Sequence, residues 1–403
     1  MFYLGIDVSK NSARYSILDE SGSKVKAFTL KNDKESLESL SERFKSLSIS
    51  ADNLLIGIEA TGSFWENIYS FIKNKGFNIV LLNPYHTNKF REALAKKAKT
   101  DDIDALIIVQ LLRTGEYVQS QVAEEDIQSL RELTNLRYEF VKERKNLQRQ
   151  VYSLLSIVFP EYKKTVIARP FSQASMAILQ AFPTAKHLAD AKPKKIEKIA
   201  RNIQGNNFNI NQIQQLIDTA RNSIYSGRAK DARATTLKML LNHIKTLSAS
   251  IKELEAQMKA ILSPSDDDES FPGQNLLSIK GVGEKTLAAL ISYLGSDASN
   301  FPNSKSAVGY VGFYPKIYES GQRRKDNKIS KRGPKVLRWA LYMAAVASLR
   351  HNKEMRTLYH KKLSQGKTQK QALICVAKKL LQISLSLLKS GQTYDPARVF
   401  VSN

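Results

Sequence analysis

Cysteine is almost absent from this sequence, since Cys375 is the only one among 403 residues, and the five histidines are scattered. No disulfide can form within the chain, and no cysteine–histidine spacing indicates a zinc site. We therefore expect Cys375 to be a small core residue in a reducing compartment. No apolar run approaches the ~18 residues that predict a membrane-spanning helix. The chain begins directly with a strand pattern, so we expect a cytoplasmic protein with no signal peptide and no membrane partner.

Acidic residues are in the minority: 38 aspartates and glutamates face 62 lysines and arginines, which gives a net charge of +24. The hydrophobic content of 42% excludes global disorder, and the length allows two or three domains. Such a basic chain favours nucleic acid as a partner, although ribosomal and membrane-surface proteins share this property.

Residues 1–120 alternate strand and helix patterns. Three strands, Phe2–Val8, 13–18 and 24–30, come first, and two more are expected at Leu54–Glu59 and 78–82. Helices are expected near 35–46, 64–75, 84–94 and 101–113. A three-stranded meander followed by alternating helices and strands predicts an α/β domain with a mixed sheet and helices on its faces.

Residues 121–273 are expected to be helical, with a long coiled coil and a variable helical insert at 160–232. A helix at 126–158 carries two heptad rows: Leu133, Phe140, Leu147 and Leu154, and Leu130, Arg137, Arg144, Val151 and Val158. The two arginines in the second row could mark helix register or face phosphate. A second seam contains Leu237, Leu240, Ile244, Leu247, Ile251, Leu254, Met258 and Ile261. It could pair with the first helix or with another protomer.

After a linker at 263–273, residues 274–403 predict a mainly helical C-terminal domain. Helices are expected at 335–350, after Pro334, and at 369–389, before Gly391.

Four acidic residues predict a metal site. Asp7 and Glu59 each close a strand pattern, while Asp101 and Asp104 lie three apart on one helix face, which Thr100 could cap. Carboxylate oxygens suit hard cations such as Mg²⁺, which can stabilise both oxygens of a phosphodiester displacement. The alternative is that these are ordinary acids at strand ends and a helix start. Asp102 could also compete for the role of Asp101.

Two basic segments predict contacts with nucleic acid. The first, residues 279–288, has the form of a helix-hairpin-helix turn, in which a backbone phosphate would meet Lys280, Gly281, Gly283 and Lys285. A simple glycine turn is the alternative. The second, residues 318–333, is a cationic loop with Arg323, Arg324, Lys328, Lys331 and Arg332. Judged by local sequence alone, Ser320 and Ser330 in this loop are surface hydroxyls.

Several motifs resemble those of one insertion-sequence transposase family, which has a RuvC-like DEDD domain and is related to the Piv invertases. The N-terminal motifs are Gly-Ile-Asp-Val-Ser-Lys at 5–10, Ile-Glu-Ala-Thr-Gly at 58–62 and Lys-Thr-Asp-Asp-Ile-Asp-Ala at 99–105. The C-terminal motifs lie at 279–288, 301–315, 318–321, 329–333 and 337–343. The order and spacing of these motifs are specific.

This resemblance implies a DNA recombinase that mobilises its own element, guided by an element-encoded bridge RNA. It implies an RNase H-like domain that holds Mg²⁺ through Asp7, Glu59, Asp101 and Asp104. It also implies that Ser320 is the nucleophile, although Gln322-Arg323-Arg324 replaces the family's more serine- and glycine-rich stretch. The expected partners are the DNA of the element ends and target, the guide RNA, and further copies in a dimer or tetramer.

The resemblance places the protein in the bacterial or archaeal cytoplasm, associated with the nucleoid. Two other functions stay open on the residues alone. One is a RuvC-like metal-dependent DNA junction nuclease without serine chemistry, and the other is a nonenzymatic nucleic-acid scaffold.

Overall fold

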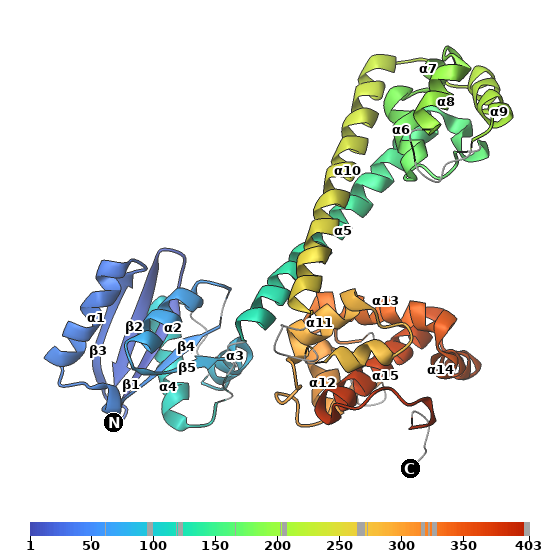
Figure 1. Ribbon diagram of the computed structural model, residues 1–403. Helices are drawn as coiled ribbons and strands as arrows, with labels where there is room; N and C mark the ends of the chain where they lie inside the picture. Colours follow the sequence, from blue (N-terminus) through green and yellow to red (C-terminus); the bar gives the residue numbers. More distant parts are fainter. Residues whose placement is uncertain are drawn as a thin grey trace. The chain divides into compact units, whose positions relative to one another are not determined.

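The structure is a computed structural model that describes residues 1–60, 62–94, 100–117, 119, 124–165, 167–201, 203, 208–263, 271, 273–315, 319–320, 323–324 and 329–398, with backbone alone at 319–320 and 323–324. The chain splits into two compact units, Met1–Ala123 and Glu124–Asn403 (Figure 1). The sequence analysis divides the chain into three parts, at 1–120, 121–273 and 274–403. The further division of the second unit stays a prediction.

The first unit contains a five-stranded mixed sheet in the order β3-β2-β1-β4-β5 (Figure 1). Its strands are β1 (Phe2–Val8), β2 (Ser12–Leu18), β3 (Lys24–Lys31), β4 (Leu54–Glu59) and β5 (Asn78–Leu82). β1 is antiparallel to β2 and parallel to β4. The helices are α1 (Lys34–Ser46), α2 (Trp65–Asn74), α3 (Pro84–Ala93) and α4 (Asp101–Thr114). The predicted α/β character and mixed sheet of this region are confirmed.

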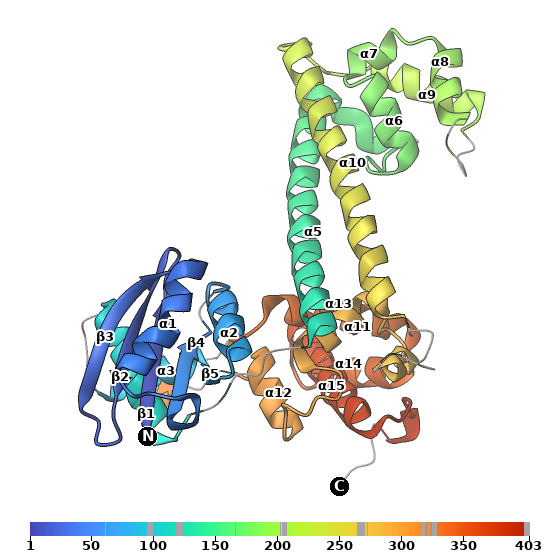
Figure 2. The same cartoon turned by 60° about the vertical axis from the view of Figure 1, so that its left-hand side comes forward.

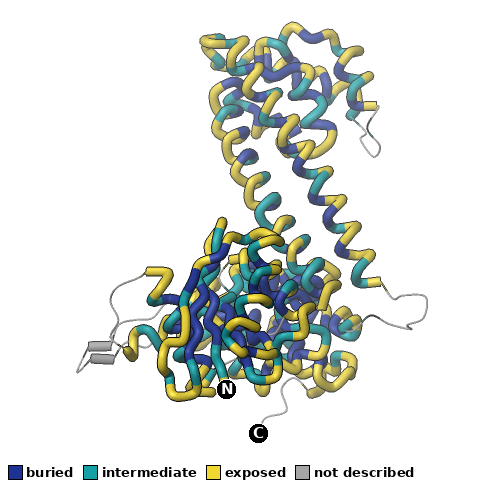
Figure 3. The backbone as a smooth tube through the Cα atoms, turned by 90° about the vertical axis from the view of Figure 1, so that its left-hand side faces the viewer, coloured by how far each residue is buried: buried dark blue, intermediate teal, exposed yellow. Residues whose placement is uncertain are grey.

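Alternation along the strands divides the core between the two faces of the sheet. Leu4 and Ile6 of β1 are fully buried in a cluster that includes Phe44 of α1 and Ile68 of α2. The other face carries a smaller apolar cluster to which α4 contributes, made of Val80, Leu82, Ile108 and Leu112. Figure 3 shows buried stretches along the strands in dark blue.

Helix α4 lies unusually close to the sheet because β1 and β4 each have a glycine on that face. A Cβ atom at Gly5 would overlap the carbonyl oxygen of Ala105 and lie 2.6 Å from the backbone nitrogen of Val109. A Cβ atom at Gly57 would lie 3.2 Å from a methyl carbon of Leu112. The absent side chains therefore let the α4 backbone approach the strands.

Two long helices of the second unit, α5 (Glu125–Val158) and α10 (Lys230–Ile261), pack side by side (Figures 1 and 2). Both helices were predicted, and the buried face of α10 follows the predicted seam with one correction. Leu241 is buried, whereas Leu240 and Ile261 are only partly buried. Because α5 of the same chain covers this seam, the seam gives no support for pairing with another protomer.

Both arginines in the second heptad row of α5 contact α10. A guanidinium nitrogen of Arg137 lies 2.7 Å from Glu255 Oε1, and Arg144 Nη1 lies 3.3 Å from the Ser248 hydroxyl oxygen to which it donates. These contacts support the interpretation that the two arginines mark helix register within the chain, and the alternative that they face phosphate stays a prediction.

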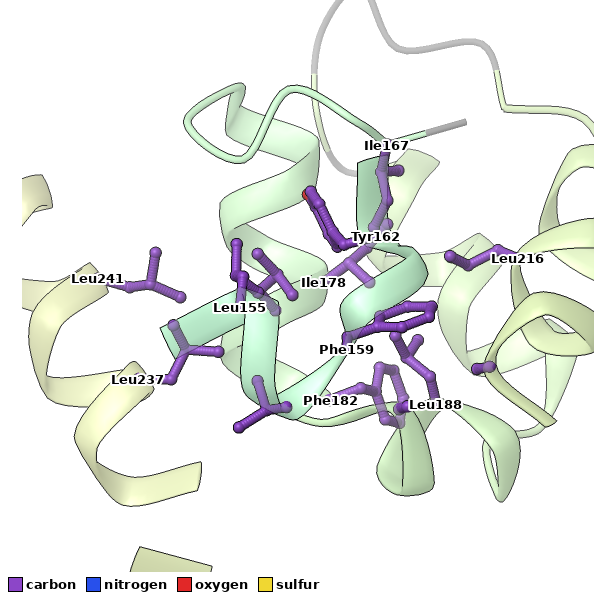
Figure 4. Packing of buried hydrophobic residues seen from close by; sticks show 14 of the residues in the cluster. Leu155, Phe159, Tyr162, Ile167, Ile178, Phe182, Leu188, Leu216, Leu237 and Leu241 are labelled. Carbon is purple, nitrogen blue, oxygen red and sulfur yellow. The ribbon is translucent and has the colours of Figure 1, made fainter. Parts of the chain in front are cut away.

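The insert at 160–232 folds as a small helical cluster between the end of α5 and the start of α10. A 3₁₀ turn (Pro160–Lys164) precedes α6 (Gln173–Ala181), α7 (Ala185–Ala189), α8 (Pro193–Arg201) and α9 (Ile210–Arg221). Figure 4 shows Phe159 and Tyr162 packed among Ile178, Leu188 and Leu216, and the same core includes Leu237 of α10. The irregular sequence pattern thus encodes short helices that share one core.

The rest of the second unit is mainly helical, as predicted: α11 (Glu284–Leu294), α12 (Ser304–Val311), α13 (Lys335–His351), α14 (Lys353–Ser364) and α15 (Gln369–Ser390). One expectation needs correction, because α15 is long and apolar enough to pass a test for a membrane span. Half of that stretch is buried within the structure, as in a core helix, so its composition is weak support for a span. A short hairpin, β6 (Glu319–Ser320) with β7 (Arg323–Arg324), was not predicted.

We expect Gly5→Ala to destabilise the first unit by about 1–3 kcal/mol, because the new methyl group must push α4 away from β1. Urea denaturation followed by circular dichroism measures this loss. Gly309→Ala is the control, since a Cβ there meets nothing within 4 Å, and in α12 of the second unit it should stabilise its own helix slightly and leave the first unit unchanged. Equal stability of the Gly5 variant and the wild type would show that α4 moves without cost.

Candidate active site

Asp7 and Glu59 lie side by side because of the register between two parallel strands. Ile6 of β1 is paired with Ile58 of β4, so the next residue of each strand, an acid in both, points to the face opposite the buried isoleucines. This is the face on which α4 packs closely at Gly5. Both acidic side chains are partly buried.

The first turn of α4 brings further carboxylates to the same place. Thr100 caps this helix, as predicted, by accepting a hydrogen bond from the Ile103 backbone nitrogen at 3.4 Å. Burial raises the pKa of Asp7 to about 6, and the negative charges of Asp104, Asp101 and Glu59 add to the rise. The structure therefore brings all four predicted acids into one electrostatic neighbourhood.

Helix α3 supplies partners that the sequence analysis missed. Arg91 is ion-paired with Asp104, and its positive charge partly lowers the pKa of Asp7. The Thr87 hydroxyl donates a hydrogen bond of 2.6 Å to Glu59 Oε2. Neither residue stands out in the sequence, because the spacing of the polar residues on α3 does not indicate a contact with the acids.

Asp102, the possible competitor of Asp101, has a different place. It is ion-paired with Arg14 of β2. It is not among the charges that shift the pKa of Asp7, whereas Asp101 is. The arrangement favours Asp101 over Asp102 as the fourth member of the site.

The donor set fits a hard divalent cation by its chemistry. All four groups offer carboxylate oxygens, and a cation among them would offset both the burial and the neighbouring negative charges that raise the pKa of Asp7. Within the described part of the chain, no three acidic, histidine or cysteine side chains already lie close enough together to hold a metal ion. Binding would therefore require these side chains to draw together, with Asp104 exchanging Arg91 for the metal.

The predicted glycine turn lies before α11, after a 3₁₀ helix (Gln274–Ser278). Gly281 has a positive φ of 108°, and a Cβ there would lie 2.7 Å from Ser348 Cα of α13. This glycine is thus required for packing within the unit. Lys280 and Gly283 are exposed, whereas Lys285 Nζ lies 2.8 Å from Glu255 Oε1 of α10.

The cationic loop forms an antiparallel hairpin in which Ser320 is paired with Arg323 through the backbone. Its base is held by the Ser330 nitrogen, which donates to the Tyr314 carbonyl at 2.8 Å. The base is also held by Arg338 Nη1, which donates to the carbonyl oxygens of Val311, Arg332 and Gly333 at 2.8–3.0 Å. Lys331 and Arg332 are exposed. Lys328 and the side chains of Ser320, Arg323 and Arg324 lie outside the described part of the chain.

An acidic site on a mixed sheet, joined in one chain to a basic helical unit, is the architecture of an enzyme that acts on DNA. Residues 4–160 match the DEDD domain model of IS110 elements, described as a transposase. Transposases cut and rejoin DNA, and the DEDD domain implies the use of a divalent metal in general.

Residues 273–360 match a second model, described as a transposase of the IS116/IS110/IS902 family. The chain belongs to this family of insertion-sequence transposases.

Relatives match along nearly the whole chain. The chain is 23% identical over 400 residues to an insertion element IS110 protein of Streptomyces coelicolor, covering 98% of this chain and 95% of the relative. It is 22% identical over 395 residues to the pilin gene-inverting protein of Moraxella lacunata, covering 98% and 97%. A transposase for IS1111A of Coxiella burnetii is 29% identical over 161 residues, covering 39% and 43%.

We expect Asp7→Asn to stabilise the first unit at pH 8 by on the order of 1 kcal/mol after solvent screening. The pKa of Asp7 is raised from 3.8 to about 6 in the folded state, so folding is penalised as pH rises through this range. The gain should therefore shrink between pH 6 and pH 4, as urea denaturation at several pH values will measure.

Asp102→Asn is the matched control, because it removes a charge that is ion-paired with Arg14. It should give no gain at pH 8. A gain for Asp7→Asn that does not vary with pH would contradict the proposed repulsion.

Proposed function

We propose that this transposase cuts and rejoins DNA through Ser320, assisted by a Mg²⁺ site made of Asp7, Glu59, Asp101 and Asp104 in an RNase H-like, RuvC-like domain. One observation carries the metal part of the proposal: the β1–β4 register and the close packing of α4 concentrate negative charge at Asp7. The strand order and the antiparallel β2 fit an RNase H-like sheet.

The four carboxylates would hold the metal, which would stabilise negative charge on the phosphate oxygens at the site. Thr87 orients Glu59 through its hydrogen bond to Oε2. Arg91 balances Asp104 in the structure described, and its guanidinium is suited to contact a DNA phosphate once Asp104 turns to a metal.

In the proposed serine step, Ser320 Oγ attacks phosphorus and loses its proton, while the phosphorus–oxygen bond to one DNA strand breaks. The departing oxygen takes up a proton, and the other strand stays attached as a phosphoserine ester. The reverse reaction with a new strand hydroxyl restores Ser320, so no ATP is needed. The composition of this segment supports the step, since Arg323, Arg324, Lys328, Lys331 and Arg332 would supply positive charge for the phosphate.

The nucleic-acid partners in this proposal are the DNA of the element ends and target and a guide RNA. The net charge of +24 supports binding through phosphates, and the exposed Lys280 at the glycine turn, proposed as a helix-hairpin-helix element, is one candidate contact. The protein would work where the DNA lies, in the bacterial or archaeal cytoplasm at the nucleoid.

We also propose a homo-oligomer, a dimer or tetramer, for a chemical reason. Exchange between two DNA duplexes involves four strands, whereas each chain offers one Ser320. The α5–α10 seam is covered within the chain, so another surface must join the protomers.

A metal-dependent junction nuclease is the second candidate. The arrangement of the acids is compatible with it, because water could replace the serine hydroxyl as the nucleophile. The two candidates differ in one product: only the serine mechanism leaves protein bound covalently to DNA.

We expect Mg²⁺ to raise the unfolding temperature of the wild-type protein, because a ligand that binds only the folded state stabilises it. A stabilisation of about 2.7 kcal/mol follows at a metal concentration 100-fold above Kd. Asp7→Asn should abolish the shift, whereas Asp102→Asn should keep it. Differential scanning calorimetry with and without Mg²⁺ checks this, and an equal shift in all three proteins would refute the assigned ligands.

We expect Ser320→Ala to reduce DNA cleavage by about 10³-fold or more and to abolish the covalent adduct, because the nucleophile is lost. Ser330→Ala, ten residues along in the same segment, is the control and should keep the adduct. Trapping on a nicked DNA substrate, followed by peptide mass spectrometry, locates the modified residue. Cleavage without any adduct in the wild type would favour the junction nuclease.

A further inference from the structure

A small groove that the functions proposed above do not use lies between α5 and α13 in the second unit. Its volume is about 170 Å³, and its walls are formed by Tyr138, Val141, Lys142, Lys145, Arg149 and Trp339. Pockets for drug-sized ligands are commonly about 300–1,000 Å³, so this groove is suited to a single flat ring system. Its lining combines two aromatic rings with three cationic side chains.

The two rings form a fixed wall of the groove. Tyr138 and Trp339 have centroids 5.4 Å apart and an interplanar angle of 71°, an edge-to-face arrangement. Arg137 lies 6.0 Å from the centroid of Trp339, and its ion pair with Glu255 holds it in place. Trp339 is nevertheless only partly buried, so some of its surface is accessible from the groove.

The cations along α5 are not all neutralised. Lys142 is ion-paired with Glu139 at 3.3 Å, and Lys335 of α13 is paired with the same glutamate at 2.6 Å. Lys145 and Arg149 are exposed, and within the described residues neither has an acidic partner. Lys145 Nζ instead lies 6.0 Å from the Trp339 ring centroid, as a cation over an aromatic ring.

Lys145 and Arg149 are four residues apart on one helix, so their side chains leave the same face about 6 Å apart along the axis. Like charges at this spacing repel each other and destabilise a helix slightly. A phosphate bound between the two side chains would replace this repulsion by a net attraction. The groove thus offers an anion site directly beside an exposed aromatic surface.

We propose that this groove binds an unpaired nucleotide, with its base stacked on Trp339 and its phosphate between Lys145 and Arg149. Lys145 would move from the ring to the phosphate as the base enters. Single-stranded DNA and RNA share this chemistry, whereas the base faces of a duplex are covered by neighbouring bases. The proposal rests on the proposed function, in which strands are opened for cutting or for pairing with a guide.

The test uses the full chain with Trp65→Phe, because the protein has two tryptophans and the remaining one, Trp339, then reports on the groove alone. Its fluorescence is titrated with a single-stranded oligothymidine, a single-stranded oligouridine and a DNA duplex of equal length. We expect both single strands, or one of them, to quench Trp339, while saturating duplex leaves its fluorescence unchanged. The DNA and RNA arms identify which strand uses the groove.

Two substitutions separate stacking from charge. Trp339→Ala should weaken single-strand binding about ten-fold, within the ~1–3 kcal/mol measured per stacked base, whereas Trp339→Phe should keep most of the affinity. Lys145→Ala with Arg149→Ala should reduce the dependence of log affinity on log salt by about 0.7, the value for one neutralised phosphate of a single strand. The matched control is Lys245→Ala with Lys252→Ala, which removes equal charge from exposed positions on α10.

Unchanged fluorescence with bound single strands, or equal quenching by duplex, would overturn the proposal. If Trp339→Ala fails to fold, an identical salt dependence for the Lys145–Arg149 double variant and the α10 control would overturn it as well. These results are independent of the recombination chemistry. Quenching without DNA cleavage would count against the proposed function alone, and cleavage without quenching would count against the groove alone.

Discussion

The close contact between α4 and β1 is the constraint on which the acidic site depends. Gly5 lets the helix backbone reach the strand, and the helix carries Asp101 and Asp104 in its first turn. This contact forces like charges toward Asp7, and the apolar packing of Ile108 and Leu112 on the same face offsets the repulsion. A bulkier residue in place of Gly5 would separate the acids as well as loosen the core.

A network of ion pairs performs a comparable role in the second unit. Glu255 of α10 accepts Arg137 of α5 and Lys285 of α11, and Lys259 of α10 is paired with Glu284 at 3.0 Å. The Arg137–Glu255 pair is mostly buried, whereas Lys285, Lys259 and Glu284 are more than half exposed, so the pairs that they form contribute less. The network therefore couples the glycine turn before α11 to the two long helices, and it reduces the positive charge that Lys285 can offer to a phosphate.

The sequence predicts the regular parts of this fold well because their patterns arise from local physics. The strands around Asp7 and Glu59 and the long helices were correctly placed, since alternation and heptad spacing reflect which side chains are buried. The contacts of the arginines on α5 were harder to predict, because the sequence left open whether they mark helix register or face phosphate. Arg137 is ion-paired with Glu255, which lies 118 residues away.

The candidate site was also predictable only in part, because some of its contacts join segments that are far apart in the sequence. The four acids stand at recognisable strand ends and a helix start, but Arg91 and Thr87 reach them from α3, which no local pattern connects to the site. The packing role of Gly281 was not predicted, because the backbone that it approaches belongs to α13, 67 residues further along the chain. Contacts between distant segments depend on tertiary packing that one sequence does not encode locally.

Some charged residues of this protein lie where the usual pattern has apolar or neutral ones. Those with a structural role differ from those that point to function in whether each charge has a partner. Arginines in a helix seam break the usual pattern, yet Arg137 has Glu255 and Arg144 has Ser248. Burial and the charges of three other acids raise the pKa of Asp7, and Arg91 relieves this only in part. A bound cation, as proposed above, would offset this cost, whereas Arg137 already has a carboxylate partner in Glu255.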